Sequence, residues 1–311
     1  MKKLLIASAS VLALSAGAAF AQSNTSGSFQ NGSGNTANIS QTLGDGASTS
    51  STVYQGFNGN GDAASSSSVS VSQIGGLGSQ IASTVPQNDG GQLAAVTQNG
   101  TNGGQLTSTV SQSGFGNIAL ISQITTNATD NQRSTVTQAG SNGSVSVTQR
   151  GPVDSSKVTQ SGTNNNTGIA AIAAPNNTPV SGGVTVSQNG PTLNTSTVAQ
   201  NSSSSGVAAT QNGSGGTNDS SVSETDGGYN GAAVVQAANG GSNTSSITQG
   251  GGNGNIAGVF QTANGGINLA SVSQSGSGNW ANIAQTAITG VTNTATVAQS
   301  GTANTVTVTQ H

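Results

Sequence analysis

The stretch Gln274-Ser-Gly-Ser-Gly-Asn-Trp-Ala-Asn-Ile-Ala-Gln285 contains the signals that decide the fold of this chain. Gly276 and Asn279 belong to residue types that tolerate positive φ, so they favour a tight turn. From Asn279 onwards every second residue follows the pattern Asn-x-Ala-x-Ile-x-Gln, which places these side chains on one face of a strand. The stretch therefore predicts a turn between two strands, the first ending at Gln274 and the second at Gln285.

The same pattern of Gln, Gly, Asn and a final Gln recurs at constant spacing elsewhere in the chain. Its other copies are Gln30, Gly32, Asn35 and Gln41; Gln112, Gly114, Asn117 and Gln123; and Gln299, Gly301, Asn304 and Gln310. Recurrence at fixed spacing is typical of repeat architectures. We expect the glycines to form turns and the amide residues to occupy equivalent, stacked positions.

Half of this pattern is itself a repeat, Asn-x-Ala-x-Val-x-Gln, which extends from Gln30 to Gln310. It ends 22 times, always at Gln except at Glu224, and in 20 copies the residue two places earlier is Val or Ile. A further, degenerate copy spans 165–171. Short runs of Gly, Asn, Asp and Ser separate the copies and predict turns. β-branched residues held in this phase predict a strand for each copy.

The composition alone would suggest a disordered, low-complexity chain. Only 31% of the 311 residues are hydrophobic and 4% are charged, whereas an ordinary domain is about half apolar and a quarter charged. The net charge is only −3, however, and uncharged chains rich in Gln and Asn tend to form β structure. The regular phase of the repeat excludes disorder for the repeat region. The small number of basic residues argues against nucleic-acid binding.

The first residues predict a signal peptide over 1–21. Lys2 and Lys3 precede a mostly apolar run that is short for a membrane span. Ala19-Phe20-Ala21 matches a signal-peptidase cleavage site. We therefore expect a secreted protein, and the lack of Cys means that disulfides do not stabilise it.

After cleavage the chain divides into a short N-terminal segment, 22–29, and a repeat region, 30–311. Loop insertions are expected near 56–68, which contains a Ser run, and near 172–183, which contains two Pro. Because these insertions interrupt an otherwise regular repeat, we interpret them as loops and not as domain boundaries.

The inward-facing residues predict an all-β fold, a β-solenoid of stacked strand-turn-strand repeats with a cross-β, amyloid-like arrangement. In a solenoid, equivalent positions lie about 4.8 Å above one another, so like residues form ladders. Asn and Gln suit ladders because each amide both donates and accepts hydrogen bonds. The repeats correspond to roughly 11 or 12 two-strand rungs and a stack about 55 Å high at that spacing.

The two ends of such a stack decide how the protein associates. The first strand is expected to end at Gln30, and the last at Gln310, so both terminal rungs expose an edge. An unprotected edge strand is a template for pairing with another chain. We expect copies of this chain to add end to end and form a homopolymeric fibre.

The unit Gln-x-Gly-x-x-Asn-x-Ala-x-x-x-Gln resembles the curlin repeat, found in the subunits of curli, which are bacterial surface amyloid fibres. The match is complete in the copies that begin at Gln30, Gln112 and Gln274, and only Val306 departs from it in the copy that begins at Gln299. Weaker copies cover most of the chain, which is longer than a usual curlin and carries insertions.

This resemblance implies an exported subunit of a Gram-negative bacterium whose fibres serve biofilm matrix and cell adhesion. It also implies two kinds of partner besides the chain itself, namely a minor curlin that nucleates the fibre and an outer-membrane export machinery. Curlins carry an export segment before the first repeat, and the segment 22–29 is short for that role.

The sequence offers no catalytic, metal-binding or cofactor-binding constellation, so we expect neither an enzyme nor a small-molecule substrate. His311 is the only His. Asp45, Asp62, Asp89, Asp130 and Asp226 lie in turn-like stretches. Glu224 replaces Gln at a ladder position, where a buried carboxylate is costly; it is either locally exposed or a weak point that limits polymerisation.

One other function class stays open, a surface β-solenoid that does not polymerise and acts as an adhesin or an ice-binding protein. The run Thr305-x-Thr307-x-Thr309 would suit an array that faces ice, but it is not repeated down the stack. An outer-membrane barrel is disfavoured because the outward residues are Ser, Thr and Asn. A polysaccharide-cleaving β-helix is disfavoured because no groove of clustered charges is indicated.

Overall fold

A computed structural model of the chain describes residues 22–56, 64–101, 103–125, 127–162, 183–190 and 193–311. The predicted signal peptide and the degenerate copy at 165–171 lie outside the described residues, as do most of the two predicted insertions. The described residues form strands and turns without any helix.

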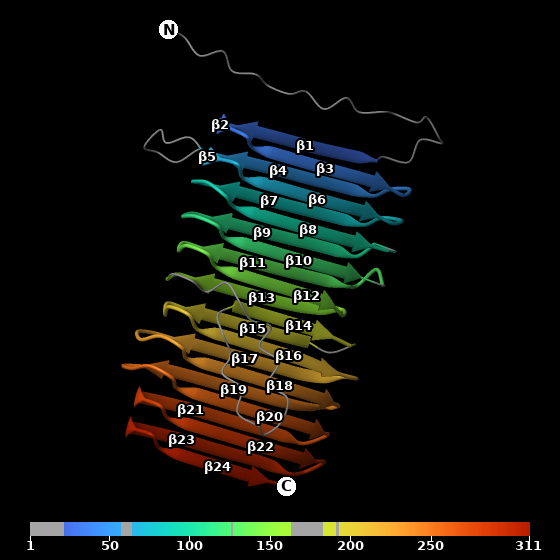
Figure 1. The fold of residues 1–311 in the computed structure, drawn as a ribbon. Coiled ribbons are helices and arrows are strands. Elements are labelled where there is room, and N and C mark those ends of the chain that lie inside the picture. Colours follow the sequence, from blue (N-terminus) through green and yellow to red (C-terminus); the bar gives the residue numbers. More distant parts are fainter. Residues whose placement is uncertain (1–21, 57–63, 102, 126, 163–182, 191–192) are drawn as a thin grey trace.

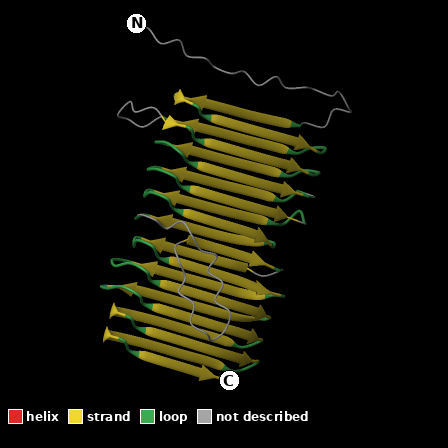
Figure 2. Cartoon of the chain, viewed as in Figure 1, coloured by secondary structure: helices red, strands yellow, loops and turns green. Residues whose placement is uncertain are grey.

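The described residues form two eleven-stranded sheets, and in both of them every described strand pairing is parallel (Figures 1 and 2). Sheet 1 contains, in spatial order, β1 (Ser23–Gln30), β4 (Ser48–Gln55), β7 (Gln80–Gln87), β9 (Gln105–Gln112), β11 (Asn131–Gln138), β13 (Val153–Gln160), β15 (Leu193–Gln200), β17 (Gly216–Glu224), β19 (Gly241–Gly250), β21 (Ile267–Ser277) and β23 (Thr292–Thr302). Sheet 2 contains β3 (Thr36–Leu43), β6 (Ser68–Gly75), β8 (Leu93–Gly100), β10 (Ile118–Thr125), β12 (Ser144–Arg150), β14 (Gly183–Asn189), β16 (Gly206–Gly213), β18 (Gly231–Asn239), β20 (Ile256–Asn264), β22 (Trp280–Ile288) and β24 (Thr305–Gln310). A small pair, β2 (Gly32–Ser33) and β5 (Ala64–Ser65), joins two turns.

The chain alternates between the two sheets, so one strand of each sheet makes a rung and the rungs stack along the molecule (Figure 1). This arrangement is a β-solenoid, and it confirms the predicted fold class. The eleven strands of each sheet correspond to the lower of the two predicted rung numbers. Sheet 1 passes directly from β13 to β15 and sheet 2 from β12 to β14, so both sheets are continuous where the repeat is interrupted at 163–182.

The pairing register places equivalent residues of successive rungs directly above one another. Gln274 pairs with Gln249 on one side and with Gln299 on the other. The same register begins at β1, where Gln30 pairs with Gln55. Ser23–Gln30 therefore belongs to the first rung of the stack, and this differs from the predicted boundary, which set 22–29 apart from the repeat region.

A thin core lies between the two sheets. It is a column of Val and Ile from each sheet, such as Val272 and Ile283, with a further column of Ala and Val from sheet 2, such as Ala281. The equivalent inner column of sheet 1 is mostly Ser, for example Ser220 and Ser245. Each rung buries few apolar atoms, and burying one Val contributes only about 1.5–3 kcal/mol. Backbone pairing and buried amides must therefore provide much of the order in this core.

The first rung departs most from the repeat. Ser28 stands where the other rungs of sheet 1 have Val or Ile. On the outward side of the same strand, the Phe29 ring stacks on Tyr54 of the next rung, with centroids 5.2 Å apart and planes at 12°. An outward aromatic contact thus partly replaces the missing inward side chain.

Candidate self-association edges

The repeated Gln residues form one continuous hydrogen-bonded column in each sheet. In sheet 2 the Nε2 of each Gln donates to the Oε1 of the Gln on the following rung, over ten successive steps of 2.7–2.9 Å from Gln41 to Gln310. In sheet 1 the same column runs from Gln30 to Gln299 and is broken once, after Glu224. The structure therefore brings Gln30, Gln112, Gln274 and Gln299 together in one column, and Gln41, Gln123, Gln285 and Gln310 in the other.

The second N–H of the Gln side chain connects the two sheets. Gln274 Nε2 donates to the carbonyl oxygen of Ile256 at 3.0 Å, and Gln285 Nε2 donates to that of Leu269 at 3.0 Å. These carbonyls belong to strands of the opposite sheet. The buried amides thus satisfy both donors, which removes most of the penalty of burying them.

The Asn columns run in the opposite direction to the Gln columns. Asn304 Nδ2 donates to Asn279 Oδ1 at 2.9 Å, so the later rung donates to the earlier one. Asn293 Nδ2 donates in the same sense to Asn268 Oδ1 at 3.1 Å. The Gln and Asn columns therefore carry amide dipoles of opposite direction along the stack.

Two of the predicted Asn positions make backbone contacts and no amide ladder. Asn35 Oδ1 accepts the Ser67 N–H at 3.2 Å. Asn117 Oδ1 accepts the Gly143 N–H at 2.9 Å, and its Nδ2 donates to the Gly140 carbonyl oxygen at 2.8 Å. The following rungs carry Ser67 and Gly143 where an amide ladder needs Asn, so these two side chains bind backbone groups of the turns.

The four predicted turn glycines all have positive φ: 112° at Gly32, 88° at Gly114, 100° at Gly276 and 102° at Gly301. At Gly114 and Gly276 a Cβ would also collide with the carbonyl oxygen of the glycine on the next rung. Glycine is therefore needed there for its φ and for the close approach of successive turns.

Both ends of the stack are open edges within the described residues. Sheet 1 ends at β1 and β23 and sheet 2 at β3 and β24, and no further described strand pairs with them. In sheet 2 the core side chains at both edges are only half-buried, namely Ile39 in β3 and Val308 in β24. The edges of sheet 2 thus expose unpaired backbone groups together with apolar surface.

The two edges are complementary in hydrogen bonding. The Gln columns direct amide oxygens towards the first rung, at Gln30 and Gln41, and amide N–H groups towards the last rung, at Gln299 and Gln310. Gln41 follows Gln30 by eleven positions, and Gln310 follows Gln299 by the same number. The last rung of one molecule therefore matches the first rung of another in strand spacing and in the direction of its Gln columns.

Two of the predicted turn acids, Asp89 and Asp130, accept hydrogen bonds from backbone N–H groups. Asp130 Oδ2 accepts the Asn127 N–H at 2.8 Å, and Asp89 Oδ2 accepts the Gly114 N–H at 2.8 Å. Asp89 and Asp226 also have positive φ, 72° and 56°, which Asp tolerates better than most residues. Asp62 lies outside the described residues.

Two buried acids occupy column positions, and one of them was missed in the sequence. Glu224 is fully buried, so the alternative that it is locally exposed is wrong. Asp154 is also buried and stands where later rungs of sheet 1 have Asn. The register of the repeat, six residues before Gln160, would have identified Asp154 as an inward residue.

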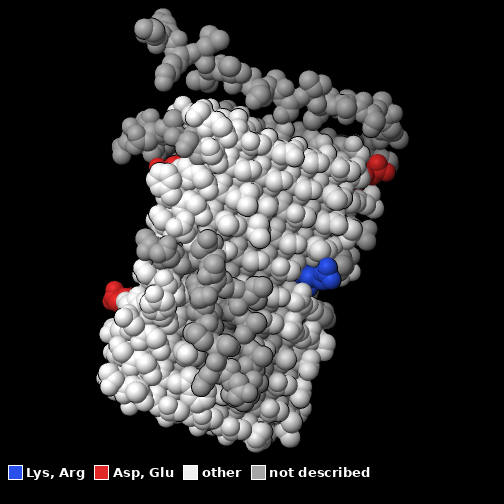
Figure 3. All heavy atoms as spheres, in the orientation of Figure 1, with Lys and Arg blue, Asp and Glu red and all other residues white. Residues whose placement is uncertain are grey.

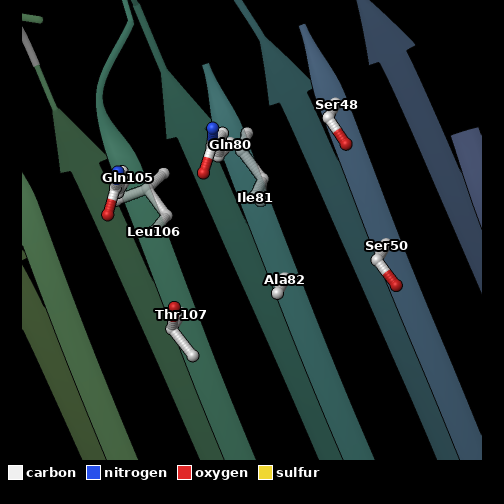
Figure 4. A pocket seen from close by; sticks show the side chains of 8 residues that line it. All are labelled: Ser48, Ser50, Gln80, Ile81, Ala82, Gln105, Leu106 and Thr107. Atoms are coloured by element: carbon white, nitrogen blue, oxygen red, sulfur yellow. The ribbon is translucent and has the colours of Figure 1, made fainter. Parts of the chain in front are cut away.

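No other feature of the described residues resembles a reactive site. The hollow shown in Figure 4 lies on sheet 1, over β4, β7 and β9, and is lined by Ser, Gln, Thr and aliphatic side chains without a charge. The face in Figure 3 carries few, scattered charges. No group of three or more metal-ligating side chains occurs in the described parts of the chain. Among the described residues there is also no helix that is long and apolar enough to cross a membrane.

No protein family model matches the chain, and neither does any curated protein sequence.

Proposed function

We propose that this protein is a structural subunit that polymerises end to end into a fibre, with the first rung of each copy pairing to the last rung of the next. The observation that carries the proposal is the complementarity of the two open edges. Addition of a copy would extend both sheets without a change of register and would bury Ile39 against Val308. A head-to-tail interface between two different surfaces yields an open filament when the operation that relates the copies does not close into a ring, as in continued stacking along one axis.

The cellular setting of the fibre is a finer part of the same proposal. The resemblance to the curlin repeat and the predicted signal peptide support an extracellular, curli-like amyloid at the surface of a Gram-negative bacterium. Biofilm matrix and adhesion are the functions that this resemblance suggests, with a minor curlin as nucleator and an outer-membrane machinery for export. The low charge of the chain suits a surface that packs against copies of itself.

A second candidate function, a non-polymerising adhesin or ice-binding protein, is favoured by one observation. The outward column of sheet 1 that lies three residues before each ladder position contains Thr or Ser on most rungs. Its members include Thr52, Thr84, Thr109, Thr135, Thr197, Ser221, Ser246, Ser271 and Thr296. A regular hydroxyl array of this kind could bind an ordered surface. The Thr305-x-Thr307-x-Thr309 run belongs to sheet 2, and its neighbours on β22 are Trp280, Asn282 and Ala284.

A test of the fibre uses one substitution at each edge. Ile39→Asp introduces a charge into the inward face of the first rung, and Val308→Asp does the same in the last rung. Ser40→Asp and Thr307→Asp introduce the same charge on outward, exposed positions of the same strands and serve as controls. We expect the two control variants to polymerise and each inward variant alone to stay monomeric, because a buried unpaired charge is costly.

Mixing the two inward variants then tests the polarity. Each retains one intact edge, the last rung in Ile39→Asp and the first rung in Val308→Asp. An equimolar mixture should therefore give dimers and no longer species in analytical ultracentrifugation. Dimers of either variant alone would show that like edges pair. Fibres from either variant alone would show that polymerisation does not depend on pairing of the first rung with the last.

A further inference from the structure

The Gln column of sheet 1 is interrupted at a single step, between Glu224 on β17 and Gln249 on β19. On one side Glu224 behaves like the Gln it replaces, since its Oε2 accepts the Gln200 Nε2 at 3.1 Å. On the other side, Glu224 Oε1 takes the place of the Nε2 atom with which the Gln side chains of this column donate to the Gln of the following rung. Glu224 Oε1 and Gln249 Oε1 are both buried acceptors without a hydrogen-bond partner.

Rotation of the neighbouring amides cannot repair this break. Gln249 Nε2 already donates to Gln274 Oε1 at 2.7 Å and to the Gly231 carbonyl oxygen at 3.1 Å. A flip of the Gln249 amide would break both bonds. On the other side, Gln200 Oε1 accepts the Gln160 Nε2 at 2.8 Å, so Gln200 is fixed in the same way. On both sides of Glu224 the amide groups of the column donate towards the later rung. A hydrogen bond between Glu224 and Gln249 therefore needs one additional hydrogen atom.

We propose that Glu224 Oε1 is a proton-binding site, and that the bound proton is donated to Gln249 Oε1 and completes the column. A neutral carboxylic acid has one acceptor oxygen and one O–H donor, the same arrangement that an amide presents along the stack. When the proton leaves, the Oε1 atoms of Glu224 and Gln249, which are paired in register on β17 and β19, are both acceptors, and the buried carboxylate is negatively charged. This site goes beyond the proposed fibre and does not depend on it.

The surroundings of Glu224 contain nothing that would favour the charged form strongly. Burial raises the pKa of Glu224 from 4.5 to about 8, and the side chains of Gln200 and Ser202 only partly lower it. The strands packed against it, β15 and β19 in sheet 1 and β16 and β18 in sheet 2, have no titratable side chain. Asp219 points outward from the same strand, and Asp226 and Tyr229 lie in the turn that follows.

The sign of the pH effect follows from the raised pKa. The folded chain holds this proton more tightly than the unfolded chain, so the protonated site stabilises the fold fully below the ordinary pKa of 4.5. That stability is lost as the pH rises from there to the folded-state pKa of about 8. Within this window, each pH unit lowers the folding equilibrium constant by up to about tenfold.

The experiment compares the wild-type chain with Glu224→Gln, which supplies the missing donor at every pH. Urea unfolding of dilute protein is measured from about pH 6 to about pH 9, a window that contains the folded-state pKa. We expect the wild-type midpoint to fall across this window and the Glu224→Gln midpoint to stay level. Asp219→Asn removes an exposed carboxylate from the same strand, and its midpoint should fall as in the wild type.

Infrared difference spectroscopy provides a readout that is separate from stability. At neutral pH the wild type should have the C=O band of a protonated, hydrogen-bonded carboxylic acid, and Glu224→Gln should lack it. The band should disappear with an apparent pKa near 8. Absence of the band at neutral pH, or the same pH profile of unfolding in wild type and Glu224→Gln, would overturn the proposal.

Discussion

At the scale of single residues, the buried Gln side chain is the unit of this structure. Gln123, for example, accepts from Gln98, donates to Gln149 at 2.7 Å and donates to the Thr107 carbonyl oxygen at 3.2 Å. Its amide is therefore used in three directions, along the stack and across to the other sheet. A side chain that only accepts cannot take its place without leaving two oxygens in contact. The two buried acids inside sheet 1, Asp154 and Glu224, therefore each leave an oxygen without a hydrogen-bond partner.

Asp154 provides a prediction at this scale. Its Oδ1 accepts the Asn194 Nδ2 at 2.9 Å, while its Oδ2 and the Oε1 of Gln132 on the preceding rung have no hydrogen-bond partner. Burial, with a smaller contribution from the charge of Asp130, raises the pKa of Asp154 from 3.8 to about 6, while hydrogen bonds from the Asn194 side chain and the Arg150 backbone partly lower it. The stability contributed by its proton is therefore full below 3.8 and lost by about pH 6.

Asp154→Asn should remove this loss, because the amide keeps an oxygen for Asn194 and adds a donor towards Gln132. We expect the variant to be more stable than the wild type at pH 7 by up to about 3 kcal/mol, and equal to it at low pH. Urea unfolding at a series of pH values measures the difference. If the variant is less stable than the wild type at pH 7, the ionised Asp154 carboxylate has sufficient hydrogen-bond partners in the folded protein, and the prediction is wrong.

At the scale of the elements, the turns set how closely successive rungs approach. Gly276 and Gly254 both have positive φ, 100° and 73°, but their surroundings differ. A Cβ on Gly276 would collide with the carbonyl oxygen of Gly301, whereas a Cβ on Gly254 would have no atom within 4 Å. Substitutions at Gly254 and Gly276 therefore distinguish the cost of a positive φ from the cost of a steric collision with the next rung.

We expect Gly254→Ala to lose about 1–2 kcal/mol of unfolding free energy, the cost of a left-handed conformation for an L-residue. Gly276→Ala should lose clearly more, about 3 kcal/mol or above, since the backbone of the next rung must move as well. Chemical denaturation of both variants measures the two losses. Equal losses would indicate that the turns have room to separate and do not set the rung spacing.

The strands and their inward faces could be predicted from the sequence, but the hydrogen-bond directions could not. The constant spacing of Gln274 and Gln285 from their neighbouring copies already implies stacked columns. Nothing in a pattern of residue types indicates that Gln amides donate towards the last rung and Asn amides towards the first, because both orders satisfy the same groups. The length of the Asn column was also overestimated from the sequence. Earlier rungs of sheet 1 have Ile81, Leu106 and Gln132 at the position of the Asn. These substitutions preserve burial, and so the repeat tolerates them.

At the scale of the whole molecule, the stack is a structure whose two ends differ. One direction of the Gln columns persists through the rungs of both sheets, so the first and last rungs present opposite hydrogen-bonding groups. The core is too thin for the ends to be protected by a large apolar cap, and Ile39 and Val308 stay half-buried. A second copy of the chain supplies what each edge lacks, which is why we place the function in self-association.

Fibre diffraction of the wild-type protein after prolonged incubation is the decisive test of end-to-end polymerisation. We expect long filaments with a meridional reflection at about 4.8 Å, because the strands would lie across the fibre axis at the rung spacing. A protein that remains monomeric and gives no such reflection would exclude the fibre and favour the non-polymerising solenoid.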